Sequence, residues 1–240
     1  MSVVIEADLV LHNGRIWCGR GENVSEALAV WQGKVLATGS SADMLSLKGP
    51  RTEVIDLEGR FASPGLIDNH LHLISTGITM GWVDATPAAA PTLAALTARL
   101  AERAAETPKG GWVRARGYDQ VKLDVGRHPT REELDRAVPD HPVLLTRACG
   151  HVAIANSMAL KLAGVTEATP VPDGGVIGLT DGRLNGFLAE NAMNLIKAAM
   201  PEVTTEELID GIERGGRYLL SLGITSCMDA AVGHVSGFAE

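Results

Sequence analysis

The stretch Phe61-Ala-Ser-Pro-Gly-Leu-Ile-Asp-Asn-His-Leu-His-Leu73 decides how the rest of the chain is interpreted. Pro64-Gly65 is typical of a turn, and the apolar run after it is short enough to be a buried strand. Side chains two residues apart on a strand point to the same face, so His70 and His72 should project side by side. Two neutral imidazoles in this arrangement can bind one divalent metal ion, and Asp68 shares their face.

The His-x-His tripeptide is weak evidence by itself, because the chain holds seven histidines and such pairs are often structural. Its context adds to the evidence. The strand-like run Glu53-Val-Ile-Asp-Leu-Glu-Gly-Arg60 leads directly into it. The combined segment resembles the start of the barrel in the amidohydrolase superfamily, where a His-x-His pair on barrel strand 1 binds the catalytic metal. The resemblance implies that His70 and His72 are metal ligands rather than a structural histidine pair.

The composition of the chain excludes several classes of protein. With 240 residues, 45% of them hydrophobic, the chain can form one large domain or two small ones. A formal charge of −8 argues against a nucleic-acid or membrane-surface protein, which would carry a basic patch. No apolar run approaches the ~20 residues that span a bilayer, and residues 1–8 do not resemble a signal peptide. The expected partner is a small-molecule substrate, with no nucleic acid and no membrane.

The cysteines point to a compartment. Cys18, Cys149 and Cys227 are odd in number and widely spaced, which suits a reducing cytoplasm. They form neither a Cys-x-x-Cys nor a zinc-ribbon pattern. We therefore expect a soluble cytoplasmic protein in which Cys149 and Cys227 are buried packing residues.

Short strands and turns dominate the chain before the histidine segment. Strands are expected on both sides of the turns Asn13-Gly14 and Gln32-Gly33, and a third strand run covers residues 53–57. Residues 8–60 therefore read as a small antiparallel β unit.

After the histidine segment, helices alternate with strands. The expected elements are a helix over 92–107 with Thr92 as N-cap, a strand over 112–119, a helix opened by the capping box Thr130-Arg-Glu-Glu133, a strand over 142–149, a helix capped by Asn156, a hairpin at Asp181-Gly182, a helix over 187–200, a helix opened by the capping box Thr204-Thr-Glu-Glu207 and a buried strand over 224–229. We interpret Asn156 as an N-cap rather than as a ligand contact.

Five further motifs resemble one branch of the superfamily, the family 3 (YtcJ-like) amidohydrolases. They are Arg116-Gly-Tyr-Asp119, His128-Pro-Thr-Arg-Glu-Glu-Leu-Asp135, Gly150-His151 with Asn156-Ser-x-Ala-Leu160, Gly186-x-x-x-Glu190 and Gly223-Ile-Thr-Ser-x-x-Asp229. The branch usually has Trp where this chain has Tyr118, and Asp where it has Cys149. These two departures bear on substrate preference.

The resemblance implies an α/β fold: the N-terminal part of a metal-dependent (β/α)8 (TIM) barrel with a small β-sandwich domain and a long insertion between barrel strands 1 and 2. The implied domains are the N-terminal part of a composite β-sandwich over residues 1–61, the barrel strand 1 region over 62–83, an inserted α/β segment over 84–201, and the barrel helix 1 and strand 2 region over 202–240.

The chain is short for that fold, since a complete (β/α)8 barrel takes ~250 residues before any insertion. Only two barrel strands fit after Phe61, so the rest of the barrel is expected to be absent. In the family, further metal ligands and the general-base Asp come from later strands, so we expect them beyond residue 240. A piece of barrel exposes a sheet edge and apolar faces. We therefore expect a homo-oligomer or association with the missing C-terminal part.

Five more residues are candidates for the substrate side of the site or for support of the metal ligands. Tyr118 and Asp119 end a strand, where sites collect in α/β folds, although they could instead cap a loop. His151 follows a glycine after a strand and could touch substrate or bond to the backbone. Glu190 could stabilise a helix N-terminus or reach the metal as an inserted carboxylate. Asp229 ends the last expected strand and could lie behind a metal ligand.

The function implied by the resemblance is a metal-dependent hydrolase that cleaves a non-peptide C–N bond, of the amide or formamide type, in a small molecule. A divalent metal, expected to be zinc, would lower the pKa of a bound water and polarise the carbonyl. Because the general base is missing, we expect this chain alone to be inactive. The alternative is a non-catalytic fragment or a regulatory binding protein that keeps the histidine segment and has lost the chemistry.

Overall fold

The computed structural model describes residues 5–19, 21, 23–230 and 232, and His234 lies outside them. The chain divides into two compact units, the first made of residues 1–67 and 223–226 and the second of residues 68–222 and 227–240. Within the described residues, none of the helices combines the length and the apolar character that a membrane crossing requires.

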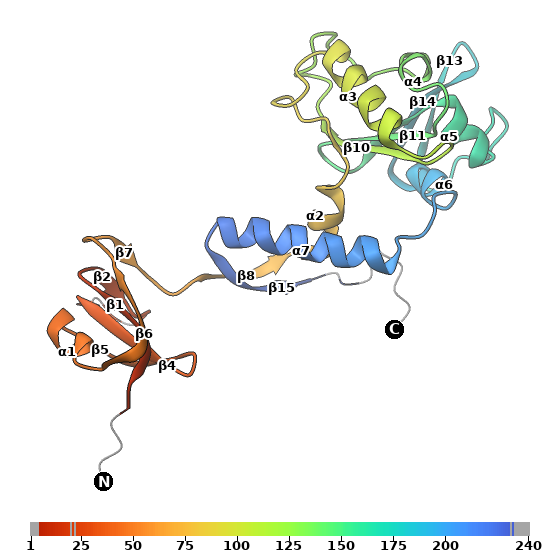
Figure 1. Ribbon diagram of the computed structural model, residues 1–240. Coiled ribbons are helices and arrows are strands. Elements are labelled where there is room, and N and C mark those ends of the chain that lie inside the picture. The colour runs from red at the N-terminus through yellow and green to blue at the C-terminus, as the bar shows by residue number, and fades with distance from the viewer. Residues whose placement is uncertain (1–4, 20, 22, 231, 233–240) are drawn as a thin grey trace. The chain divides into compact units, whose positions relative to one another are not determined.

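The first unit is built from two small sheets (Figure 1). The larger has the strand order β5-β4-β1-β6, formed by β1 (Ala7–His12), β4 (Ala27–Trp31), β5 (Lys34–Gly39) and β6 (Lys48–Asp56). The smaller has the order β3-β2-β7, formed by β3 (Val24–Ser25), β2 (Arg15–Trp17) and β7 (Phe61–Ala62). Helix α1 (Ser41–Leu45) contributes Met44 to the core, where it joins Val10 and Ala29.

The sequence prediction for this unit is correct in part. The hairpin around Gln32-Gly33 is confirmed, because β4 and β5 pair antiparallel across it. The hairpin predicted at Asn13-Gly14 is wrong, since β1 and β2 belong to different sheets. The Asn13 carbonyl instead accepts the N–H of Gly59 at 2.7 Å. Pairing with this distant segment therefore replaces the hydrogen bonds of a local hairpin. β6 runs parallel to β1, which makes the unit mixed rather than antiparallel.

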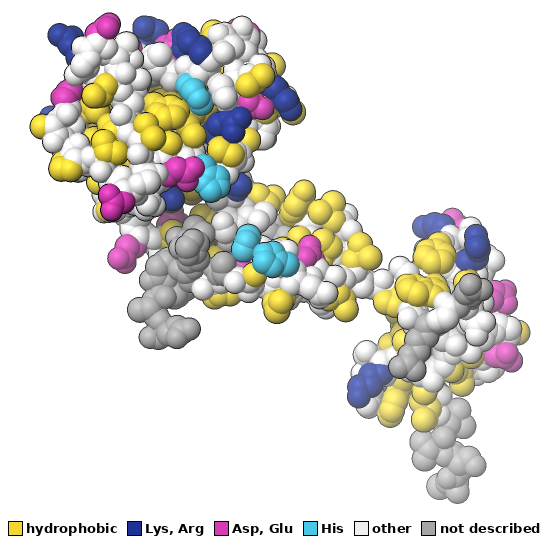
Figure 2. Space-filling model, turned by 180° about the vertical axis from the view of Figure 1, so that it is seen from behind, with side chains coloured by type: hydrophobic (Ala, Val, Ile, Leu, Met, Phe, Trp, Pro, Cys, Tyr) yellow, Lys and Arg dark blue, Asp and Glu magenta, His cyan; other side chains and the backbone are white. Residues whose placement is uncertain are grey.

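Residues 66–71 of the histidine segment form β8 (Leu66–Leu71), and His72 follows the strand. In the part of the chain that the structure describes, β8 pairs only with β15 (Ile224–Asp229). The prediction that these are buried strands is wrong. Leu66, Ile67 and Met228 are 61%, 70% and 59% exposed, because no second layer of described residues covers them. Hydrophobic side chains are accordingly visible at the molecular surface in Figure 2. The described strands form sheets of four, six, two and three members, and no barrel closes among them.

Two helices of the second unit pack together unusually closely. α2 (Leu73–Thr79) follows the histidine segment, and α7 (Thr205–Ser221) precedes β15. Glycines form the crossing: a Cβ added to Gly77 would lie 2.6 Å from the carbonyl carbon of Gly211, and Gly215 also faces Gly77. The absence of side chains is therefore what allows the two backbones to meet.

A six-stranded sheet with the order β13-β14-β12-β11-β10-β9 organises the rest of the second unit (Figure 1). Its strands are β9 (Val83–Asp84), β10 (Val113–Tyr118), β11 (Val143–Arg147), β12 (Val152–Ala155), β13 (Val176–Thr180) and β14 (Arg183–Ala189), with β9, β10 and β11 parallel and the others antiparallel. Its helices are α3 (Leu93–Glu106), α4 (Arg131–Ala137), α5 (Ser157–Leu162) and α6 (Met193–Lys197), the last preceded by the 3-10 turn Glu190–Ala192. Leu144 and Leu145 belong to different core clusters, so helices cover both faces of the sheet.

The predicted helix caps of this unit are confirmed. Thr92 caps α3 by accepting the Ala95 N–H, and both capping boxes, at Thr130 and Thr204, are present. The helix predicted over 187–200 is wrong at its start. β14 extends to Ala189 because β12 and β13 pair with it on both sides, and only Met193–Lys197 is α-helical.

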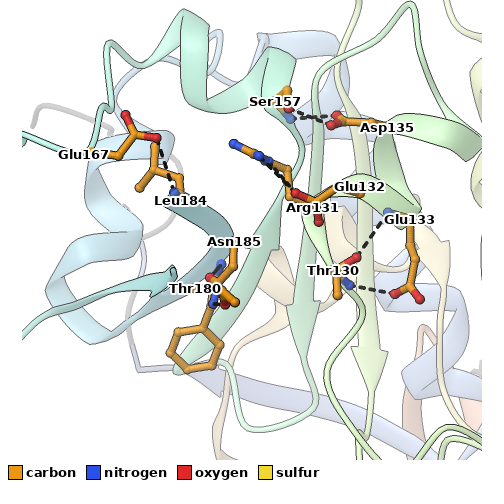
Figure 3. Close-up of polar contacts among 11 residues, drawn as sticks. Thr130, Arg131, Glu132, Glu133, Asp135, Ser157, Glu167, Thr180, Leu184 and Asn185 are labelled. Atoms are coloured by element: carbon orange, nitrogen blue, oxygen red, sulfur yellow. Dashed lines mark hydrogen bonds and ion pairs between the residues drawn. The ribbon is translucent and has the colours of Figure 1, made fainter. Parts of the chain in front are cut away.

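Figure 3 shows how α4 is attached to its neighbours. Thr130 Oγ1 accepts the Glu133 N–H at 3.3 Å, while Glu133 Oε2 accepts the Thr130 N–H at 2.8 Å. Asp135 accepts both the N–H and the hydroxyl of Ser157, at 2.8 and 2.6 Å. The first pair of bonds closes the N-terminus of α4, and the second ties α4 to the start of α5.

Candidate metal centre and a second polar cluster

The two histidines predicted to bind metal lie where β8 meets α2. Their ring centroids are 5.5 Å apart and their ring planes make an angle of 76°. His70 lies on β8, which ends at Leu71, and His72 is the N-cap of α2, so the two rings meet at the point where the strand alternation ends. Asp68, which was expected beside them, uses Oδ1 to accept the His70 N–H at 2.9 Å. The backbone therefore brings two imidazoles together while the carboxylate of the same strand is engaged with the main chain.

Asp229 reaches the same place from the end of β15. Its Oδ1 lies 3.7 Å from Nδ1 of His72, and its Oδ2 accepts the Ile74 N–H at 3.1 Å. The Asp229 side chain is only 12% exposed, whereas that of His72 is 49% exposed. The distance to His72 is that of an ion pair rather than of a hydrogen bond, and a slightly closer approach would give the carboxylate–imidazole contact that orients metal-binding histidines. The sequence predicts this position for Asp229, and its role toward a metal stays a prediction.

The donors of this cluster fit a divalent metal in type. Imidazole nitrogens and carboxylate oxygens suit zinc and related ions, which take about four ligands. The number of donors is too small: among the described residues, no group of three or more His, Cys, Asp or Glu side chains is arranged to hold a metal. The described residues therefore bring together two imidazoles and one carboxylate, and a metal bound there would need further ligands.

His151 and Glu190 form a second cluster where two inner strands of the six-stranded sheet meet, His151 just before β12 and Glu190 just after β14. Nδ1 of His151 lies 2.9 Å from Oε2 of Glu190, and the Glu190 N–H donates to the His151 carbonyl at 2.9 Å. Glu190 has φ = +51°, a left-handed conformation that is uncommon for a glutamate. The hydrogen bond and the charge of Glu190 raise the pKa of His151. The structure brings these two candidates together, and their contact with a ligand stays a prediction.

Replacing Glu190 by glutamine should lower the pKa of His151, because the amide carries no negative charge. Since the folded-state pKa is raised, the pair stabilises the fold below the unfolded-state pKa of about 6.5, and this contribution disappears as pH rises through the folded-state value. The effect on stability should be small, because both side chains are more than half exposed. An NMR titration of the His151 ring measures the change. Glu167→Gln, which alters another exposed carboxylate, is the control.

An unchanged pKa of His151 in the Glu190→Gln variant would contradict the pairing. An equal fall in the Glu167→Gln variant would instead indicate a general charge effect.

The prediction that Cys149 and Cys227 are buried is wrong, because both are exposed. Cys149 lies in the turn between the antiparallel strands β11 and β12, and Cys227 lies on β15, whose outer face no described residue covers. Partial burial raises the pKa of the Cys149 thiol, but hydrogen bonds from the Arg147 side chain and the His151 N–H outweigh it. The net effect is a lowered pKa.

Tyr118 lies in the core rather than at a site surface, contrary to the role expected from its strand end. It is 0% exposed, and its hydroxyl lies 2.9 Å from Nδ1 of His128. The cause is a shift of the β10–β11 register at Gly117 (φ +103°), which turns Tyr118 inward. Burial raises the pKa of Tyr118 and lowers that of His128.

Asp119 fits the loop-capping alternative. Its Oδ1 accepts the Val121 N–H at 3.1 Å, and it lies 3.6 Å from Nη2 of Arg147. The Arg147 side chain contacts both Asp119 and Cys149, and the sequence analysis did not single it out. Its position at the end of β11, two residues before the cysteine, could have indicated this role. Asn156 is confirmed as an N-cap, since its Oδ1 accepts the Ala159 N–H at 3.0 Å.

Comparison with known proteins decides the family. Residues 53–240 match the amidohydrolase family. This chain belongs to that family. The family inferred from the sequence motifs is thus confirmed.

The amidohydrolase matches curated proteins and solved structures over most of its own length. It is 34% identical over 225 residues to the putative amidohydrolase YtcJ of Bacillus subtilis, which covers 90% of this chain and 41% of that protein. It is 30% identical over 231 residues to the N-substituted formamide deformylase of Arthrobacter pascens, and the match covers 94% of this chain and 43% of that protein. An uncharacterized metal-dependent hydrolase from Pyrococcus horikoshii has a similar crystal structure, with a TM-score of 0.68, 30% identity and coverage of 93% and 43%. The chain therefore spans less than half the length of these relatives.

Proposed function

We propose that this amidohydrolase chain is part of an enzyme that uses a divalent metal, zinc, to hydrolyse a non-peptide C–N bond of the amide or formamide type in a small molecule. The observation that carries the proposal is the imidazole pair, with ring centroids 5.5 Å apart and the largely buried Asp229 beside it. The family match and the likeness to a metal-dependent hydrolase support hydrolysis with a metal. The name of the A. pascens relative supports a C–N substrate.

The described residues would hold the metal ion and orient the substrate. A bound metal supplies a water of lowered pKa and polarises the substrate carbonyl. His70 and His72 would hold the ion, and Asp229 would keep the His72 ring in place. In the second cluster, which His151 and Glu190 form, the carboxylate of Glu190 favours the charged form of the His151 ring. We assign to His151 a hydrogen bond to an oxygen of the substrate.

The β8–β15 sheet would be the first two strands of a (β/α)8 barrel in this proposal. Its exposed side chains, Leu66, Ile67 and Met228, would be covered by further β/α units. A longer form of the chain, a separate segment or a second copy would provide them. The missing metal ligands and the general base would come from the same units, for which the relatives, more than twice as long as this chain, have room.

The second candidate is a binding protein of this family without catalysis. The observation that favours it is that the described residues assemble no group of three or more metal-binding side chains. Metal binding separates the two candidates, because the hydrolase requires it and the binding protein does not.

A zinc titration against a competing chelating dye tests the proposed function on the chain as it exists. We expect about one zinc per chain, held weakly because an open site takes about three protein ligands and this one has fewer. The double variant His70→Ala, His72→Ala should bind at least ~10-fold more weakly, since removal of a single supporting group already costs about that much. His12→Ala, in the first unit, is the control.

Unchanged affinity in the double variant would place the metal elsewhere and contradict the proposal. Absence of binding by the wild-type chain would contradict the expectation that the histidine pair holds zinc without further ligands.

A further inference from the structure

A cavity of about 350 Å³ lies at the C-terminal end of α2, opposite to the end that carries His72. Residues of α2 and its following turn, α3, β10 and α7 line it, and all belong to the second unit. None of the metal-site candidates is among them. The volume falls within the range of about 300–1,000 Å³ that small-molecule sites have.

Two indole rings form the apolar part of the lining. Trp82 follows α2 and Trp112 precedes β10, and both are half-buried. The guanidinium carbon of Arg114 lies 5.9 Å from the centre of the Trp82 ring, a cation–π contact. Flat rings and a guanidinium plane of this kind offer stacking surfaces to an aromatic ligand.

The polar part of the lining has an excess of positive charge. Arg103, Arg114 and Arg214 face the cavity together with the carboxylates of Glu207 and Asp210. Glu207 is engaged, because its Oε2 accepts the Thr204 N–H at 3.0 Å in the capping box of α7. Among the described residues, Arg114 and Arg214 form no ion pair.

A purely structural role explains only some of these groups. Nη1 of Arg103 donates to the Gly81 carbonyl at 2.8 Å, and Nη1 of Arg214 donates to the Gly77 carbonyl at 2.7 Å, so both side chains secure the end of α2. A guanidinium has five N–H donors, and each of these bonds uses one. The anchored arginines thus keep donors for a ligand in fixed positions, and Arg114 is not needed for the anchoring.

We propose that this cavity binds a small aromatic carboxylate, with its ring against the indoles and its carboxylate on Arg114 and Arg214. A guanidinium fork binds a carboxylate through two parallel hydrogen bonds, which a neutral ligand cannot match. The site is separate from the histidine pair and does not depend on the proposed hydrolysis.

Benzoate is the probe, and two analogues isolate its parts: benzamide keeps the ring without the charge, and cyclohexanecarboxylate keeps the charge without the flat ring. Calorimetry measures affinity, and tryptophan emission locates the ligand, since Trp82 and Trp112 line the cavity while the other two tryptophans, Trp17 and Trp31, lie in the first unit. We expect saturable benzoate binding with a change in emission that is lost in a Trp82→Phe, Trp112→Phe variant. Both analogues should bind at least about fivefold more weakly.

Variants of charged residues test the assignment of the arginines. Arg114→Gln should weaken benzoate binding about tenfold, whereas Arg217→Gln, at an exposed position of α7 outside the cavity, should leave it unchanged. Asp210→Asn removes the unengaged carboxylate and should tighten binding about twofold, a gain that misfolding cannot produce, while Glu213→Gln should not. Absence of saturable binding, equal binding of benzamide, or equal effects of Arg114→Gln and Arg217→Gln would each overturn the proposal.

Discussion

Alanine in place of Gly77 is expected to force α2 and α7 apart and to lower the free energy of unfolding of the second unit by about 2–3 kcal/mol. The added Cβ would lie 2.6 Å from the carbonyl carbon of Gly211, and a backbone group cannot rotate away as a side chain can. Alanine favours a helix by about 1 kcal/mol over glycine, which offsets only part of this cost. Urea unfolding measures the total, and hydrogen exchange of the α2 and α7 amides shows where stability is lost.

Gly216 is the matched control, because it lies in the same helix α7 and an added Cβ there meets nothing within 4 Å. Gly216→Ala should raise stability by about 0.5–1 kcal/mol through helix propensity alone. If Gly77→Ala were as harmless as Gly216→Ala, the close approach of the two helices would be wrong.

The second large effect is expected at Asn156, which is 1% exposed. Its Oδ1 accepts the N–H groups of Val143 and Ala159 at 2.9 and 3.0 Å, and its Nδ2 donates to the His141 carbonyl at 2.9 Å. Asn156→Ala leaves these buried groups without partners, which costs about 1 kcal/mol each. We therefore expect a loss of about 3 kcal/mol in urea unfolding.

Thr92→Ala provides the comparison, since Thr92 is also an N-cap but its side chain accepts a single bond, from Ala95. Its loss should cost only about 1 kcal/mol. Equal losses in the two variants would mean that Asn156 acts only as a cap and that its bonds to β11 and to His141 contribute nothing.

The features that could be predicted from the sequence are those set by neighbours in the chain. Thr92, Thr130 and Asn156 cap helices because a short polar side chain reaches an N–H only three residues ahead. The His70–His72 proximity also has a local origin, since the two residues are only two positions apart at the end of β8 and the start of α2.

The features that could not be predicted depend on segments far away in the sequence. Residues 187–189 have apolar spacing compatible with a helix, yet pairing with β12 and β13 makes them strand. Cys149 was expected to be buried but is exposed, because it lies in a turn. Tyr118 was expected to line a site but is buried, because the register shifts at Gly117. The approach of Asp229 to α2 joins residues 155 positions apart, so its geometry required the structure.

The glycine crossing of α2 and α7 also bears on how the long segment between these helices is accommodated. Gly77 and Gly211 touch on either side of that segment, so it leaves and returns at adjacent points of the framework. A chain excursion whose ends are already together adds little closure entropy, however long it is. The six-stranded sheet is therefore an insertion whose loops can be substituted or exchanged without moving the framework that carries it. That framework consists of β8, α2, α7 and β15.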